Sequence, residues 1–293
     1  MVQKQTAQIY IANSAIVTVT DMGHILEMQH MEKQNNKVHI QKIDKNRYVH
    51  LATGEIHQFK LSENRGDNEN SLRQTFKRMR FLINKNFKGN PNELHITMTY
   101  AENMTDTKRL YVDFDKFMKR LRYKYKGRST IDYMNVVEPQ QRGAWHIHML
   151  IRFNDLDNVF ISNEELRNMW GQGFVTIKSL KNNTNIGAYL SAYLADIEVP
   201  EGYEVKGQKE VMVKQVDGKD KRFIKGGRLW MYPPGMNLFR KSKGIVYPER
   251  KKMTYKNLKK IVGSVKPHFQ KQYKVEKESF KNTITQVQYN LKR

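Results

Sequence analysis

The chain contains no cysteine among its 293 residues. Disulfide bonds, thiolate nucleophiles and cysteine-based zinc sites are therefore excluded. The sequence also lacks an apolar run long enough to span a bilayer, and the residues from Met1 to Gln5 do not have the character of a signal peptide. These absences predict a cytoplasmic protein without a membrane partner.

Acidic residues are scarce relative to basic ones. The 29 Asp and Glu residues face 52 Lys and Arg residues, which gives a formal net charge of +23. Such an excess favours an acidic polymer as partner, because each neutralised phosphate releases counterions. With 39% hydrophobic and 11% aromatic residues the chain can still bury a core. Composition thus indicates a folded protein that binds nucleic acid, with a merely solubilising basic surface as the alternative.

Local patterns divide the chain into three segments. Residues 1–66 contain short strand-like runs separated by polar turns, which form either a small domain or extra strands of the main one. Residues 67–245 alternate strands with amphipathic helices, and this order predicts an α+β fold with a central antiparallel sheet and flanking helices. Residues 246–293 are predicted to be a basic C-terminal tail, partly helical near 256–262.

Two amphipathic helices are predicted in the first half of the middle segment. Ser71 is placed as the N-cap of the first, whose apolar residues recur at helical spacing as far as Phe87. Asp113 is placed as the N-cap of the second, whose apolar stripe ends at Tyr125. The opposite side of this second helix is rich in Lys and Arg, so it is either a solvated face or a DNA contact.

The most informative stretch runs from Trp145 to Ile151, where one apolar residue separates two histidines. The pattern is typical of a strand, and residues two apart on a strand share a face, so His146 and His148 project together. Paired imidazoles can hold a divalent metal, and Glu138, at the end of the preceding predicted strand, can join them across a hairpin. The alternative is an ordinary polar strand face.

A second candidate group lies on a helix predicted from Asn185 to about Ala195. Tyr189 and Tyr193 are four residues apart, which places them on one helix face, roughly 6 Å from each other. Core packing is the ordinary explanation for such a pair. A tyrosine becomes a nucleophile only when its proton is lost or its electrophile is activated, and a metal that polarises a phosphodiester supplies that activation.

Together with a predicted strand at 94–100, these motifs resemble the HUH endonucleases, and specifically the rolling-circle replication initiator (Rep) proteins of plasmids and single-stranded phages. The three motifs occur in the order of that family: a strand ending in Ile96-Thr97-Met98-Thr99-Tyr100, the histidine strand, and the tyrosine helix. The flanking runs 71–76, 138–148 and 228–235 are also similar to members of the family, so the resemblance spans roughly residues 70–245.

The resemblance implies an HUH/ferredoxin-like Rep nuclease fold and an enzyme that nicks and joins single-stranded origin DNA. It implies that His146, His148 and Glu138 bind Mg²⁺ or Mn²⁺. It also implies that Tyr189 attacks the scissile phosphate, leaving a 5′-phosphotyrosine and a free 3′-hydroxyl, with Tyr193 as the second tyrosine of two-tyrosine enzymes. Because the chain has no Walker-type motif, unwinding would come from a host helicase, and a host polymerase would extend the 3′-hydroxyl.

Basic side chains near these motifs are candidate DNA contacts, namely Arg142, Lys178, Lys181 and Arg228. One position departs from the family pattern, because the lysine usual three residues after the first tyrosine is Ala192 here. This leaves open which tyrosine acts first. The alternatives are an HUH-type relaxase or transposase, or an origin-binding protein whose active site has decayed. A metal-dependent hydrolase of small molecules would leave the charge unexplained.

Overall fold

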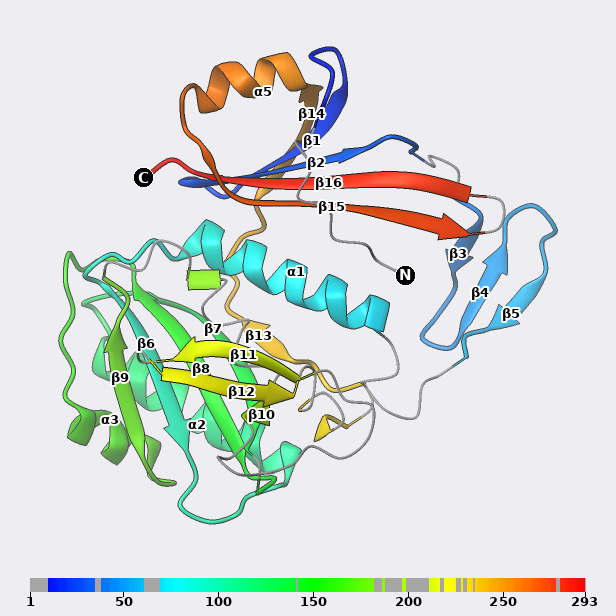
Figure 1. Ribbon diagram of the computed structural model, residues 1–293. Coiled ribbons are helices and arrows are strands. Elements are labelled where there is room, and N and C mark those ends of the chain that lie inside the picture. Colours follow the sequence, from blue (N-terminus) through cyan, green and yellow to red (C-terminus); the bar gives the residue numbers. More distant parts are fainter. Residues whose placement is uncertain are drawn as a thin grey trace. The chain divides into compact units, whose positions relative to one another are not determined.

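The structure is a computed structural model, and its described residues form two compact units (Figure 1). One unit comprises residues 64–247, and the other combines residues 1–63 with 248–293. The described residues are 10–34, 38–60, 69–140, 142–181, 186–187, 197–198, 211–216, 219–224, 228, 231–233, 235–277 and 280–292.

The larger unit is built on a five-stranded sheet with the strand order β13-β7-β8-β6-β9. All four neighbouring pairs are antiparallel. The predicted α+β fold with a central antiparallel sheet is confirmed, and so is the hairpin that joins its second and third strands. The strands are β6 (Glu93–Thr99), β7 (Ile131–Pro139), β8 (Trp145–Phe153), β9 (Val175–Ser179) and β13 (Phe239–Lys241).

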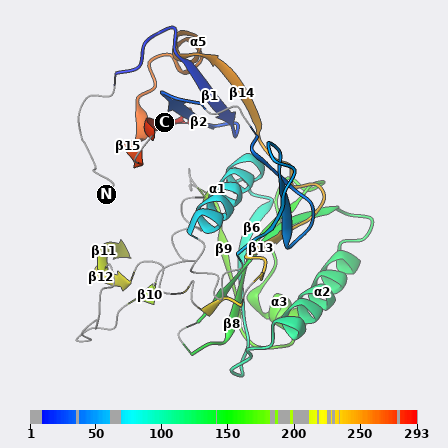
Figure 2. The ribbon, with the colours of Figure 1, turned by 90° about the vertical axis from the view of Figure 1, so that its right-hand side faces the viewer.

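Helices cover both faces of this sheet (Figure 2). On one face, α2 (Thr107–Lys124) and α3 (Asn163–Trp170) bury their apolar sides against the odd-numbered residues of β8. On the other face, α1 (Glu69–Asn86) packs against apolar side chains of β7 and β8, among them Val136 and Leu150. The alternation of β8 therefore feeds two separate apolar clusters, one on each side of the sheet.

Both predicted helix caps were wrong. Helix α1 begins at Glu69, so Ser71 lies inside it and its carbonyl accepts from the Thr75 hydroxyl. Helix α2 is capped by Asp106, whose carboxylate accepts two backbone N–H groups at 2.7 and 3.3 Å. Asp113 is buried inside α2 and accepts from the Tyr100 hydroxyl. Either Asp suits a cap locally, but the helix extends toward Asp106 because the residues between them add contacts with the core.

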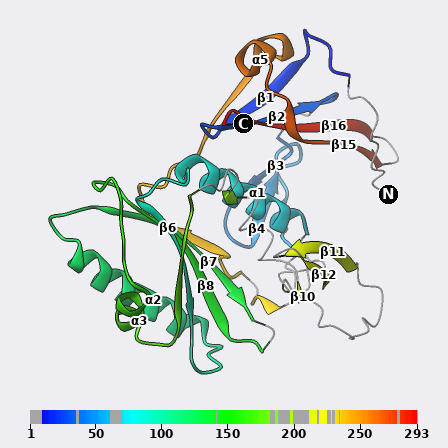
Figure 3. The same cartoon turned by 60° about the vertical axis from the view of Figure 1, so that its left-hand side comes forward.

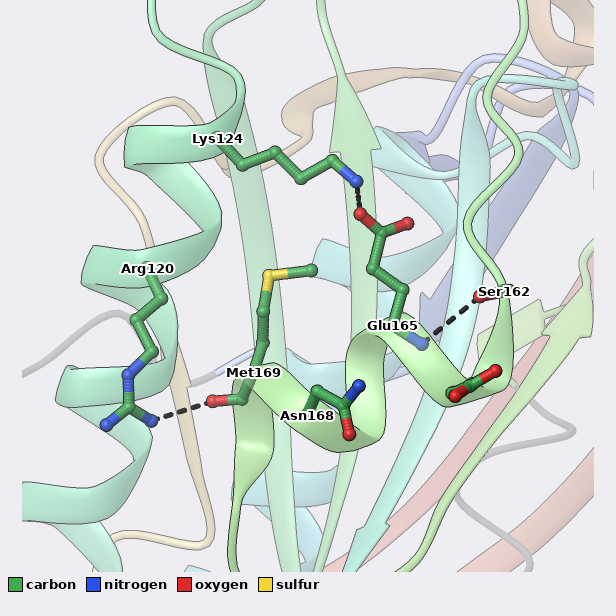
Figure 4. Close-up of a pocket in the computed structure, with 7 residues that line it drawn as sticks. Arg120, Lys124, Ser162, Glu165, Asn168 and Met169 are labelled. Carbon is green, nitrogen blue, oxygen red and sulfur yellow. Dashed lines mark hydrogen bonds and ion pairs between the residues drawn. The ribbon is translucent and has the colours of Figure 1, made fainter.

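Two basic residues of α2 are used to hold α3 (Figure 4). The Arg120 guanidinium donates to the main-chain oxygen of Met169 at 2.8 Å. Lys124 forms an ion pair with Glu165, whose backbone N–H is in turn accepted by the N-cap Ser162 at 3.1 Å. These two cations therefore have a structural function in the packing of the two helices.

The smaller unit joins strands from both ends of the chain in one antiparallel sheet, ordered β14-β1-β2-β16-β15. Figure 1 shows the blue strands β1 and β2 next to the red strand β16. Residues 1–66 and 246–293, which the sequence assigned to separate segments, thus share a sheet, and the last segment is mostly strand. Pairing over such a distance leaves no local signal. The elements are β1 (Ile16–Asp21), β2 (Ile25–Met31), β14 (Glu249–Thr254), α5 (Tyr255–Val262), β15 (Pro267–Lys277) and β16 (Phe280–Asn290).

Short strands complete the two units. A three-stranded sheet in the smaller unit contains β3 (Ile40–Lys42), β4 (Arg47–His50) and β5 (Ile56–Gln58). Another in the larger unit contains β10 (Ile197–Glu198), β11 (Val211–Val216) and β12 (Lys219–Ile224). None of the helices in the described ranges has the length and apolar character needed to cross a membrane.

Candidate active site

The predicted histidine pair lies on β8, which runs between β7 and β6 (Figure 3). Trp145 and Ile147 are buried beneath α2, so His146 and His148 project together from the opposite face, as predicted. The strand register places Glu138 of β7 directly beside His146, and Thr97 of β6 directly beside His148. Three neighbouring strands therefore contribute polar side chains to one patch.

His148 is fixed by hydrogen bonds at both ring nitrogens. Its Nε2 lies 2.6 Å from Glu138 Oε2, and its Nδ1 lies 3.3 Å from Thr97 Oγ1. An ionised carboxylate can only accept, so Nε2 of the neutral ring donates to Glu138 and Nδ1 accepts from the Thr97 hydroxyl. The threonine and the glutamate thus define both the tautomer and the ring orientation of His148.

His146 is held less tightly. Its ring centroid lies 6.2 Å from that of His148, and its buried Nε2 has no hydrogen-bond partner among the described residues. His95 of β6 approaches His148 from the other side, with 5.6 Å between ring centroids. A buried imidazole nitrogen without a partner is costly, so the Nε2 of His146 is suited to an external ligand.

Burial keeps these imidazoles neutral. Desolvation, followed by the charge of His148, lowers the pKa of His95 to about 3. Desolvation, followed by His148 and Arg142, lowers the pKa of His146 to about 4. Desolvation, followed by Lys178, lowers the pKa of His148 to about 4. At neutral pH the rings are therefore uncharged, which is the form that binds a metal ion.

Arg228 supplies the positive charge next to Glu138. Its Nη1 forms an ion pair with Glu138 Oε1 and also donates to the main-chain oxygen of Pro139 at 3.0 Å. The side chains of Arg228 and Glu138 are only 17% and 7% exposed. Both carboxylate oxygens are consequently engaged, one by the guanidinium and the other by His148.

The donor set suits a divalent cation in its chemistry and position. Two neutral imidazoles and one carboxylate share a strand face, and the Nε2 of His146 lacks a partner among the described residues. In the described part of the chain, no group of three or more His, Asp or Glu side chains is arranged to hold a metal ion. The ion pair with Arg228 explains this, because Glu138 faces the guanidinium. A bound ion would therefore compete with Arg228 for the carboxylate.

The other basic residues predicted to contact DNA differ in their relation to this patch. Arg142, in the β7–β8 hairpin, donates to the main-chain oxygen of Tyr100, and its charge acts on His146. Lys178 lies on β9 opposite His95, and its charge acts on His95 and His148.

Lys181 lies in the exposed turn after β9. Three of the four predicted cations, Arg142, Lys178 and Arg228, thus exert their charge at the histidines, whereas for Lys181 the structure gives an exposed position alone.

Tyr189, Tyr193 and Ala192 lie outside the described residues. Two helical residues just before them, Ile186 and Gly187, are described. Ile186 is buried in the cluster beneath α1, and the Gly187 N–H donates to Asn84 Oδ1 at 2.9 Å. A Cβ at Gly187 would lie 2.9 Å from the main-chain oxygen of Arg80, so only glycine allows this close approach. The start of the tyrosine segment is thereby anchored on α1.

The sequence comparison identifies one family. Residues 93–198 match the model of the "Replication-associated protein ORF2" family, whose members are rolling-circle replication initiators. The predicted resemblance to rolling-circle initiators is confirmed. The Rep-type match runs from the first residue of β6 to the last residue of β10 and includes the positions of both tyrosines. It indicates a replication-associated function that involves DNA. No curated protein and no solved structure matches the chain.

Within this Rep-type segment, sequence reasoning left two residues out of the site. Strand alternation had placed His95 and Thr97 on the polar face of their strand, but an ordinary half-exposed strand was the favoured interpretation. The structure brings both against His148, because β6 pairs with β8 across more than fifty intervening residues. The residue pattern gave their face, but it gave no indication of their neighbour.

Proposed function

We propose that this chain is a rolling-circle replication initiator that nicks and rejoins single-stranded origin DNA. The observation that carries the proposal is the patch formed by His146, His148 and Glu138, which lies within the Rep-type match, on the strands that precede the tyrosines. The net charge of +23 supports a phosphodiester substrate. Host helicase and polymerase would be needed to unwind the duplex and to extend the new 3′ end.

His146, His148 and Glu138 would hold Mg²⁺ or Mn²⁺, which when bound polarises the scissile phosphate. Thr97 would keep the His148 ring oriented, as the second shell of a metal site does. Arg228, released from Glu138, would remain as a cation close to the phosphate.

The reaction is a transesterification. The phenolic oxygen of Tyr189 forms a bond to phosphorus, and the bond from phosphorus to the 3′ oxygen breaks. The tyrosine loses its proton, and the leaving 3′ oxygen gains one. Rejoining reverses these steps, and Tyr193 provides a second nucleophile for termination.

The test is formation of a covalent adduct with randomised single-stranded oligonucleotides and Mn²⁺, followed by mapping of the linked peptide. We expect an adduct that survives denaturation, is lost with chelator, and is lost in the Tyr189→Phe/Tyr193→Phe protein. The control is Tyr123→Phe, which alters a side chain that is 80% exposed on α2. If the doubly substituted protein nicks DNA with the metal, the tyrosine mechanism is wrong.

One observation favours a second candidate, an origin-binding protein without nuclease activity. Arg228 already neutralises Glu138, and the position of the usual lysine is Ala192. Under this alternative the protein binds origin DNA and forms no adduct at any Mn²⁺ concentration. Restoring the lysine with Ala192→Lys would then leave the adduct absent, whereas an active but slow enzyme would gain rate.

A further inference from the structure

The positive charge of the smaller unit is concentrated near its C-terminal helix. Between residues 250 and 275 the sequence contains nine Lys and Arg residues and no Asp or Glu. This stretch comprises most of β14, all of α5 and most of β15. It lies outside the Rep-type match at 93–198, so the candidate active site does not account for it.

Helix α5 presents part of this charge on one face. Thr254 caps the helix, and Leu258 and Val262 are buried against the sheet near β1 and β14 (Figure 1). Lysines at 256, 259 and 260 are exposed. Since residues three and four apart are neighbours on a helix, these lysines lie together, away from the buried side. We call Lys256, Lys259 and Lys260 the α5 basic face.

The α5 basic face brings no evident stability to the helix. Like charges at this spacing repel one another, and a lysine in the first turn faces the positive end of the helix dipole. The first turn contains no acidic residue, and in the described part of the chain none of the three lysines has a carboxylate partner. On α2, by contrast, Arg120 and Lys124 hold α3. The α5 lysines are thus arranged as a ligand-binding surface would be.

The chemistry of this face selects the form of nucleic acid. Proteins that bind single strands stack bases on exposed aromatic rings. Here the aromatic residue of the helix, Tyr255, packs toward the core, with Lys259 over its ring at 5.4 Å, and the exposed apolar side chain is Ile261. A rigid helix with clustered lysines and no exposed ring fits the regularly spaced phosphates of duplex DNA.

We propose that the α5 basic face docks on the phosphate backbone of duplex DNA next to the strand that is nicked. This inference rests on the proposed function, and it assigns duplex binding to the smaller unit and strand chemistry to the larger one. The contact carries no base information, because lysines on phosphates fix position and not sequence.

The test compares two triple variants of the full chain, each lacking three positive charges. One is Lys256→Gln/Lys259→Gln/Lys260→Gln, and its matched control removes exposed lysines of α2, namely Lys108→Gln/Lys116→Gln/Lys119→Gln. Duplex affinity is measured as a function of salt concentration. Each phosphate contact contributes about 0.9 to the slope of log K against log salt, so the α5 variant should lose about 3 units of slope. At 0.15 M salt its affinity should fall on the order of 100-fold, while the control changes little.

Three outcomes would overturn the docking surface: an unchanged slope in the α5 variant, an equal change in the control, or a loss confined to single-stranded DNA. Glutamine maintains helix propensity and removes repulsion, so the melting temperature should be unchanged or higher. Adduct formation on a single-stranded oligonucleotide is measured in parallel and should be retained by the α5 variant. A failure of the tyrosine mechanism would abolish the adduct in every variant, and the two proposals are therefore tested separately.

Discussion

Replacing Arg228 by methionine should destabilise the larger unit by about 3 kcal/mol, because removal of one partner of a buried ion pair costs about 3–5 kcal/mol. Glu138 is 5% exposed and would lose its guanidinium partner. The lower end of the range applies because His148 Nε2 continues to donate to the carboxylate. Methionine fills similar volume, so the loss is electrostatic. The exposed pair of Lys124 and Glu165 is the contrast, since Lys124→Met should cost at most about 1 kcal/mol.

The assay is urea denaturation of four proteins: wild type, Arg228→Met, Glu138→Gln and the double variant. Once Glu138 has lost its charge, the substitution at Arg228 should cost less, and the coupling free energy should be at least about 1.5 kcal/mol. Mn²⁺ should stabilise Arg228→Met more than wild type, because the carboxylate is then available. At a hundred times the dissociation constant, the gain is about 2.7 kcal/mol.

Two results would refute this reasoning. A coupling free energy below about 0.5 kcal/mol would mean that the guanidinium and the carboxylate do not depend on each other. Equal stabilisation of wild type and Arg228→Met by Mn²⁺ would mean that the metal and the arginine do not compete for Glu138.

Further predictions concern pH, ring orientation and backbone packing. His146 and His148 have folded pKa values of about 4, so between pH 6.5 and 4 the unfolded state binds more protons and stability falls on acidification. Urea titrations at pH 7 and 5 should show a loss of up to about 1.4 kcal/mol per unit for each histidine, and His146→Asn should reduce it; an unchanged pH slope would argue against burial of the neutral ring. Thr97→Val should weaken Mn²⁺ binding about 10-fold by calorimetry, whereas Thr97→Ser should retain it; equal affinities would remove Thr97 from the site. Gly187→Ala should cost about 1–3 kcal/mol, since its Cβ would lie 2.9 Å from the Arg80 oxygen, and should reduce the tyrosine adduct; wild-type stability would show that α1 can yield.

Local pattern was sufficient for features that depend on neighbouring residues. Alternation put His146 and His148 on one face, and the short connection after Glu138 made antiparallel pairing of the two strands the simplest arrangement. Helical periodicity located the main helices, but not where they begin, since Asp106 and Asp113 are equally suitable caps and only burial of the extra turns distinguishes them.

The tertiary structure decided which distant residues meet. Pairing of β6 with β8 brought Thr97 and His95 to His148, and the chain near residue 228 returned Arg228 to Glu138 across 90 positions. The same is true of the sheet that joins β1 and β2 to strands after residue 248. The physical reason is common to these cases. A residue's own face follows from the local backbone period, whereas its partner depends on which strands gain most by burying their apolar sides together, and that is a property of the whole chain.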